Sequence, residues 1–124
     1  MRVDASSGVP FYRQVIDCIL LGLAEGSLKA GQKLPTVRQA AVDLSINPNT
    51  VVRAYRELEI RGIVTTQQGT GTFITPQQAG ASSEASKEER RRQLEALVSD
   101  FLSRAGAAGF RVEEISSVLQ ERGR

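Results

Sequence analysis

Apolar residues recur at helical spacing along the first quarter of the chain. Pro10 suits the first turn of a helix, because the N–H that proline lacks would have no helical partner there. Apolar side chains then follow at positions 11, 15, 16, 19, 20 and 23, which is the spacing of one face of a helix. The pattern predicts a helix over about residues 10–25, and Gly26 ends it.

Two shorter helices follow, and each has its own start signal. Thr36 is a favourable N-cap, and Gln39 three residues later completes a capping box. Asn47 is the next N-cap, with Pro48 at the first helical position. Apolar residues at 51, 54, 55 and 58 give the last helix an inward face, and Gly62 ends it.

Two β-rich runs come next, at residues 63–67 and 72–75. Gly69, Thr70 and Gly71 lie between them, which is typical of a hairpin connection. Two short helices joined by a tight turn and followed by a two-stranded wing make a winged helix-turn-helix, a DNA-binding unit.

A change of composition marks the rest of the chain. The segment after Pro76 is rich in Gly, Ala and Ser, and apolar residues at helical spacing resume beyond it. We therefore expect a mainly α fold with a small β-hairpin wing: a winged helix-turn-helix domain over 9–77, a linker over 78–86 and a two-helix C-terminal extension over 87–124. The extension is expected to form a dimer through an apolar stripe that includes Leu94, Leu97, Phe101, Ile115 and Leu119.

Composition excludes several classes of function. The 124 residues contain no histidine and a single cysteine, which leaves no imidazole chemistry, no intramolecular disulfide and no usual zinc site. Cys18 lies in an apolar helical stretch, so we expect a buried, inert thiol. No apolar run approaches the roughly 20 residues that cross a bilayer. We expect a cytoplasmic protein that has no membrane partner, metal or cofactor and is not an enzyme.

The charge of the chain is a weak indicator. The net charge is +2, and all of it lies in residues 1–76, which hold 8 basic and 6 acidic side chains. The excess is too small by itself to predict a nucleic-acid partner, so the pattern of elements carries that inference.

The second helix of the pair would enter the major groove with its first turns against the base edges. Helix N-termini and the glycine-rich wing suit phosphates and close approach to the duplex. The candidate contacts to double-stranded DNA are Thr36, Arg38, Asn47, Asn49, Thr50, Val52, Arg53, Gly69, Thr70 and Gly71.

Each of these residues also has a purely structural interpretation. Thr36 and Asn47 would cap helices in any protein, and Gly69 and Gly71 could serve only the turn. Arg53 could be ordinary solvated surface. The coincidence of two capped helices, a polar leading face and a glycine wing favours DNA binding. The alternative is a winged-helix module that binds a protein through the same face.

The ordered motifs resemble the GntR family of bacterial transcription regulators. The resemblance covers about residues 9–76 and rests on three segments: Leu34-Pro35-Thr36-Val37-Arg38, Thr50-Val51 with Ala54-Tyr55 and Leu58, and Gly69-Thr70-Gly71-Thr72-Phe73. The turn Asn47-Pro48-Asn49-Thr50 and the short tail are similar to the small YtrA-type branch. The resemblance implies a homodimeric repressor that binds a palindromic operator, in that branch often that of a neighbouring transporter operon.

The resemblance also implies which positions contact DNA: Thr36, Arg38, Asn49, Thr50 and the wing glycines. Two departures limit it. Position 48 is commonly arginine in the family and is proline here, and position 52 is often polar or basic and is valine here. About 48 residues follow Pro76. Two helices of that length do not readily enclose a ligand pocket like that of the large effector domain that many members carry. The sequence therefore identifies no effector.

Overall fold

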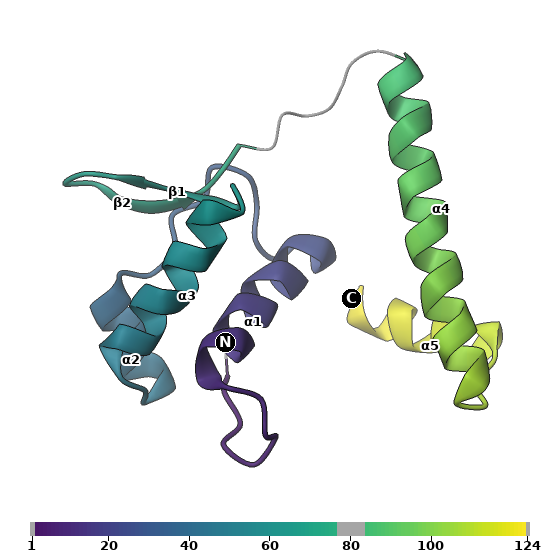
Figure 1. The fold of residues 1–124 in the computed structure, drawn as a ribbon, viewed down its shortest axis with the longest axis horizontal. Coiled ribbons are helices and arrows are strands. Elements are labelled where there is room, and N and C mark those ends of the chain that lie inside the picture. The colour runs from purple at the N-terminus through teal and green to yellow at the C-terminus, as the bar shows by residue number, and fades with distance from the viewer. Residues whose placement is uncertain (1, 77–83, 124) are drawn as a thin grey trace. The chain divides into compact units, whose positions relative to one another are not determined.

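The computed structural model describes residues 2–76 and 84–123, which form five helices and one hairpin (Figure 1). The elements are α1 (Phe11–Glu25), α2 (Val37–Leu44), α3 (Pro48–Ile60), β1 (Val64–Gln67), β2 (Gly71–Ile74), α4 (Glu84–Ala107) and α5 (Val112–Arg122). They separate into two compact units, Met1–Pro76 and Gln77–Arg124. The mainly α class with a hairpin wing and a helical C-terminal part is confirmed. The helix α4 begins earlier than expected, because residues 84–86 of the predicted linker are helical, and 78–83 lie outside the described residues.

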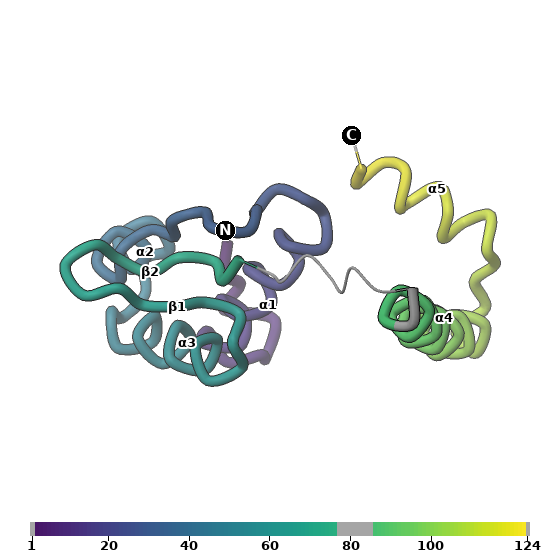
Figure 2. Tube along the Cα trace, turned by 90° about the horizontal axis from the view of Figure 1, so that it is seen from above, coloured from purple at the N-terminus to yellow at the C-terminus, as the bar shows by residue number. Residues whose placement is uncertain are grey.

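The first unit is built around α3, which packs against α1, α2 and β1. Figure 2 shows the hairpin lying over α2 and α3 when this unit is seen from above. The core consists of apolar side chains from every element of the unit: Val15, Ile16, Ile19, Leu34, Ala40, Ala41, Leu44, Val51, Ala54, Tyr55, Leu58, Val64 and Ile74. Because α3 contributes its inward stripe to this core, its opposite face is left to solvent.

The turn between α2 and α3 is tight and strained at one residue. Ser45 follows α2 with φ of 56°, in the left-handed region that favours glycine. Its N–H donates to the Val42 carbonyl at 3.2 Å, and the Ile46 N–H donates to the Ala41 carbonyl at 3.0 Å. These bonds satisfy the last carbonyls of α2 and turn the chain directly into the N-terminus of α3.

A third extended segment pairs with the hairpin, which the sequence did not predict. The hairpin itself is antiparallel, with Val64 opposite Ile74 and Gln67 opposite Gly71. On the other edge of β2, the Leu34 N–H donates to the Thr72 carbonyl and the Ile74 N–H donates to the Gln32 carbonyl, both at 2.8 Å. The segment between α1 and α2 therefore pairs with β2 from Thr72 to Ile74.

The second unit consists of α4 and α5, and none of its described side chains (86–123) is buried. Charged residues of α4 pair along its own surface, as in Arg91–Glu95 at 2.9 Å and Arg104–Asp100 at 2.9 Å. Such exposed pairs contribute little stability. The apolar side chains of this unit remain exposed in the single chain: Leu94, Leu97, Val98, Phe101, Phe110, Val112, Val118 and Leu119.

Candidate nucleic-acid interface

The leading end of α3 is open to solvent. The Asn47 side-chain oxygen accepts from the Asn49 N–H at 2.8 Å, so Asn47 is the helix cap that the sequence predicts. Asn49 is exposed and Thr50 is half-buried. The side-chain amide of Asn49 forms no hydrogen bond within the described residues, so both its oxygen and its NH₂ group are available. An amide of this kind can pair with an adenine in the major groove.

The next turn of α3 carries Val52 and Arg53, which differ in their surroundings. Val52 is 36% exposed, enough to meet a thymine methyl group. The Arg53 guanidinium lies over the ring of Tyr12 in α1, with 3.8 Å between the guanidinium carbon and the ring centroid. This cation–π contact holds the guanidinium on the α1 side of the surface, while the N–H edges of a stacked guanidinium still point outward.

The N-terminus of α2 forms a second part of the same surface. The Gln39 N–H donates to the Thr36 hydroxyl oxygen at 3.1 Å, and the Thr36 N–H donates to the Gln39 side chain at 3.0 Å, which is the predicted capping box. The hydroxyl proton of Thr36 is not used in that exchange. Arg38 follows on the exposed side of the helix and forms no ion pair within the described residues.

Tyr55 fixes α3 against the start of α2. Its hydroxyl donates to the Pro35 carbonyl at 2.8 Å, and its ring is only 6% exposed. Burial raises the pKa of Tyr55 to about 12, because the charged phenolate is poorly solvated there. The protonated hydroxyl ties the middle of α3 to the segment just before α2.

The wing turn is formed by residues 68–70. The Thr70 N–H donates to the Gln67 carbonyl at 3.0 Å, and Gly69 has φ of +79°, which a side chain would strain. A Cβ at Gly69 would meet no atom within 4 Å, so there is open space on that side of the backbone. Gly71 begins β2 with φ of +133°. A role in the hairpin turn is enough to explain why both positions are glycine. The same glycines would also let the backbone of the wing approach DNA closely.

Two residues at this surface were missed by the sequence reasoning. Tyr12 lies within the helical pattern of α1, and nothing in the sequence links it to Arg53. Lys33 precedes the Leu34-Pro35 motif and is exposed, and its side chain lies against Gly71 in the wing. Both contacts join residues distant in sequence, so only the tertiary arrangement could identify them.

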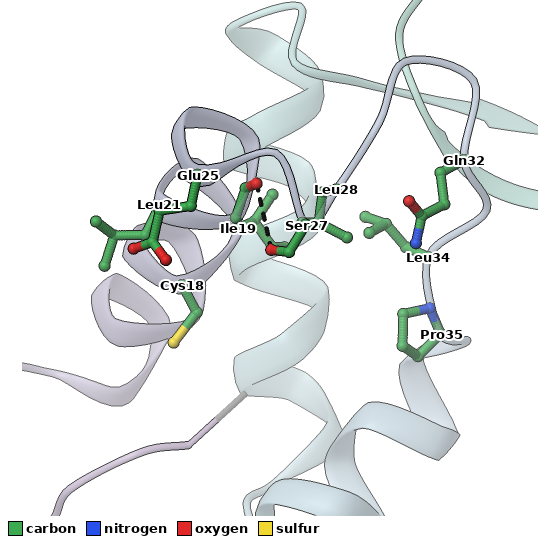
Figure 3. Close-up of a pocket in the computed structure, with 10 residues that line it drawn as sticks. Cys18, Ile19, Leu21, Glu25, Ser27, Leu28, Gln32, Leu34 and Pro35 are labelled. Carbon is green, nitrogen blue, oxygen red and sulfur yellow. Dashed lines mark hydrogen bonds between the residues drawn. The ribbon is translucent and has the colours of Figure 1, made fainter. Parts of the chain in front are cut away.

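An apolar groove of about 430 Å³ lies between α1 and the segment that leads to α2 (Figure 3). Leu21, Leu28 and Leu34 are among its lining residues, and the Ser27 hydroxyl at its edge donates to the Gly22 carbonyl at 3.3 Å. Glu25 and Gln32 are the other polar residues of its lining besides Ser27 and Cys18. Cys18 lines one side and is half-buried rather than buried, with its thiol 3.5 Å from the Arg2 carbonyl oxygen.

The described residues contain neither a cluster of three metal-ligating side chains nor a helix long and apolar enough to cross a membrane. The site is therefore a surface made of helix ends and a hairpin. These parts define the class of the first unit as a winged helix-turn-helix.

Comparison with known proteins agrees with this class. The model of the bacterial regulatory proteins, gntR family, matches residues 11–74. The HTH-type transcriptional repressor YtrA of Bacillus subtilis is 35% identical over 121 residues, which is 98% of this chain and 90% of that protein. A GntR family transcriptional regulator from Listeria monocytogenes has a similar structure, with a TM-score of 0.63, 30% identity and coverage of 96% of this chain and 98% of that one. The DNA-binding domain of AraR in complex with operator ORR3 has a TM-score of 0.53 and 26% identity, covering 59% of this chain and 88% of that one.

The chain belongs to the GntR family of bacterial transcriptional regulators. It is similar to YtrA along almost its whole length, including the helical C-terminal part. The first unit is accordingly the DNA-binding domain of a transcriptional regulator.

Proposed function

We propose that this protein represses transcription as a homodimer on a palindromic operator, with the leading end of α3 in the major groove of each half-site. The observation that carries the proposal is the exposure of that end. Asn49, Val52 and Arg53 lie on the solvent side of α3, while Val51 and Leu58 hold the other side in the core. A recognition helix needs this division between a buried and an open face.

The remaining candidate contacts are assigned by the same argument. We infer that Thr36 and Arg38 at the start of α2 meet the phosphate backbone, since helix N-termini suit anions. We assign Asn47 and Thr50 at the start of α3 to the same interface, where Asn47 also caps the helix. Gly69, Thr70 and Gly71 would approach the minor groove or its sugar-phosphate walls.

The second unit supports the homodimer. Leu94, Leu97, Phe101 and Leu119 are each between 53% and 68% exposed, and Ile115 is half-buried. Between α4 and α5 lie two apolar hollows of about 420 and 460 Å³, both lined by Phe101, Ile115 and Leu119. Exposed apolar surface of this extent is unfavourable in a free monomer. A second copy offers the same surface, and a two-fold pairing of the α4–α5 units buries both.

A two-fold dimer sets the geometry of the operator. The two α3 helices would enter major grooves on one face of the duplex, so half-site centres would lie about 34 Å apart or at a multiple of that spacing. Repression is proposed because YtrA of Bacillus subtilis is named a repressor. The first targets to test are the chain's own promoter and any adjacent transporter operon. The proposal also places the protein in the cytoplasm and gives it no enzymatic activity.

Titration of the full chain with DNA from upstream of its own gene, over a range of salt concentrations, tests the proposal. An operator-binding protein should lose about 0.9 units of log K per unit of log salt for each phosphate contact. A footprint with two-fold symmetry and a dimer by light scattering at micromolar concentration are also expected. A monomer, or salt-independent binding, would contradict the proposal and favour a winged-helix protein-interaction module.

A further inference from the structure

Lys33 is placed against the wing rather than extended into solvent. It forms a bridge with Phe73 in β2, next to the Leu34–Thr72 and Gln32–Ile74 hydrogen bonds. Its side chain then runs along the hairpin toward the turn. A Cβ built at Gly71 would lie 2.8 Å from Cε of Lys33 and 3.6 Å from its Nζ.

The missing side chain at Gly71 therefore creates the channel in which Lys33 lies. A methyl group there would come closer to Cε of Lys33 than real Cβ atoms come to their neighbours, so the flexible end of the lysine would have to move away from the wing. The backbone at Gly71, with φ of +133°, also disfavours any side chain. Glycine at this position therefore leaves room for the end of a lysine side chain that comes from a different segment of the chain.

The ammonium group at the end of this side chain is not held in an ion pair by the described residues. No carboxylate in the part of the chain that the structure describes forms a salt bridge with Lys33, although other basic residues such as Arg61 do pair, with Glu57 at 3.4 Å. Lys33 is exposed, so its charge is hydrated and free to exchange water for a phosphate oxygen. The end of its side chain lies beside Gly71, the first residue of β2 after the 68–70 turn, which is the part of the wing nearest to DNA in the proposed complex.

We propose that Lys33 contacts a DNA phosphate from the wing and that Gly71 positions it for this contact. The inference rests on the proposed operator binding and adds a charged group to a wing whose turn and flanking residues, 67–71, carry no formal charge. A lysine ammonium acts on phosphate as a point charge without base preference. Lys33 thus strengthens binding to every sequence and anchors the wing beside the groove.

Three single variants test the role of the charge. Lys33→Met keeps an unbranched chain that can lie along Gly71 but has no charge, and Lys33→Arg keeps the charge. Lys29→Met is the matched control, because Lys29 is the only other lysine in the first unit and its side chain does not contact the wing glycines. Binding of the operator duplex and of a random duplex would be measured for each between about 50 and 200 mM salt, a range over which phosphate contacts change affinity strongly.

Lys33→Met should reduce the salt slope by about 0.9 for each bound subunit and weaken operator and random DNA by the same factor. Lys33→Arg and Lys29→Met should keep the slope of the original chain. If the original chain binds the operator with a steep salt dependence and Lys33→Met has the same slope, the proposed role of Lys33 is overturned while operator binding stands. If neither the original chain nor Lys29→Met bound the operator with a steep salt dependence, operator binding itself would be contradicted.

Gly71→Ala tests the positioning. In the original chain it should lower the salt slope, because the added methyl displaces the Lys33 side chain. In the Lys33→Met background it should leave the slope unchanged, since no charge remains to be displaced. An equal fall of the slope in both backgrounds would overturn the positioning role of Gly71. Circular dichroism melts of each variant would establish that the compared proteins are folded.

Discussion

The Arg53 guanidinium of α3 lies 3.8 Å from the centre of the Tyr12 ring of α1. The contact joins the proposed recognition helix to the helix that supports it. It also holds a basic group against α1, while the exposed side-chain amide of Asn49 stays free to meet base edges. The two side chains therefore suggest different tasks, with Arg53 directed to the DNA backbone and Asn49 to sequence.

Arg53→Ala should weaken operator and random duplex by similar factors. We expect a guanidinium held on Tyr12 to stay outside the groove, where its N–H groups suit a phosphate. Tyr12→Phe, which keeps the ring, should bind as the original chain does, whereas Tyr12→Leu should show part of the Arg53→Ala loss. Fluorescence anisotropy with both duplexes measures this. A loss of about 1–3 kcal/mol confined to the operator would show instead that Arg53 reads a base.

Asn49→Ala should relax specificity at one base pair of each half-site. Its amide is exposed and forms no side-chain hydrogen bond among the described residues, so it can make a bidentate contact worth about 1–3 kcal/mol of discrimination. The measurement is competition with duplexes that carry each single substitution. Specificity that stays the same at every position would remove Asn49 from the set of residues that read sequence.

Tyr55→Phe should lower the free energy of unfolding by about 1 kcal/mol at neutral pH, because the Pro35 carbonyl loses its donor. The difference should depend on pH in one direction. Burial raises the folded-state pKa of Tyr55 to about 12, above the unfolded value of about 10. Its stabilisation is therefore complete below about pH 10 and is lost as the pH rises toward 12.

Urea denaturation of both proteins from pH 7 to 12 checks this dependence. The advantage of the original chain over Tyr55→Phe should shrink above about pH 10, while contributions from residues common to both proteins cancel. A constant difference across the whole range would show that the Tyr55 hydroxyl does not need to remain protonated in the folded state.

Leu58 and Ile60 offer a matched test of which face of α3 is buried. Leu58 is fully buried and Ile60 is 74% exposed, two residues along the same helix. Leu58→Ala should destabilise the protein by about 2–5 kcal/mol through lost burial and a cavity, and Ile60→Ala by no more than about 0.5 kcal/mol. Thermal unfolding compares the two. Similar losses for both variants would contradict the orientation of α3 on which the exposed recognition face depends.

Phe101→Asp should convert the proposed dimer into a monomer, because a carboxylate would have to be buried in the apolar interface. Ser99→Asp is the control, since it adds the same charge on the other side of α4. Light scattering at micromolar concentration should find a dimer for the control and a monomer for Phe101→Asp. A dimer in Phe101→Asp as well would contradict the assignment of this apolar stripe to the dimer interface.

Local signals explain which parts of the site could be predicted from sequence. Thr36 with Gln39 and Asn47 with Pro48 mark helix starts through contacts within three residues, and the structure has both caps. Gly69 marks the hairpin turn by its backbone freedom alone. Contacts between distant segments gave no such signal. The pairing of residues 31–34 with β2 depends on where α1 ends in space, because no local pattern encodes the edge of a sheet.

Helix α4 shows the same limit in the second unit. Its first residues resemble a linker in composition, because Ser and Ala are common to linkers and to helix starts, and the boundary of such a helix is weakly encoded. The exposed apolar stripe, in contrast, follows from the helical spacing of apolar residues in the amino-acid sequence. What covers that stripe depends on a second molecule, which a single sequence does not describe.

Hydrogen–deuterium exchange of the full chain with and without operator DNA tests the central claim most directly. The claim is that the duplex meets the leading end of α3 and the wing. We expect slower exchange in peptides that cover residues 47–53 and 67–71 when the operator is bound, with a smaller effect from random DNA. Tight binding that leaves both of these segments unchanged would contradict the account.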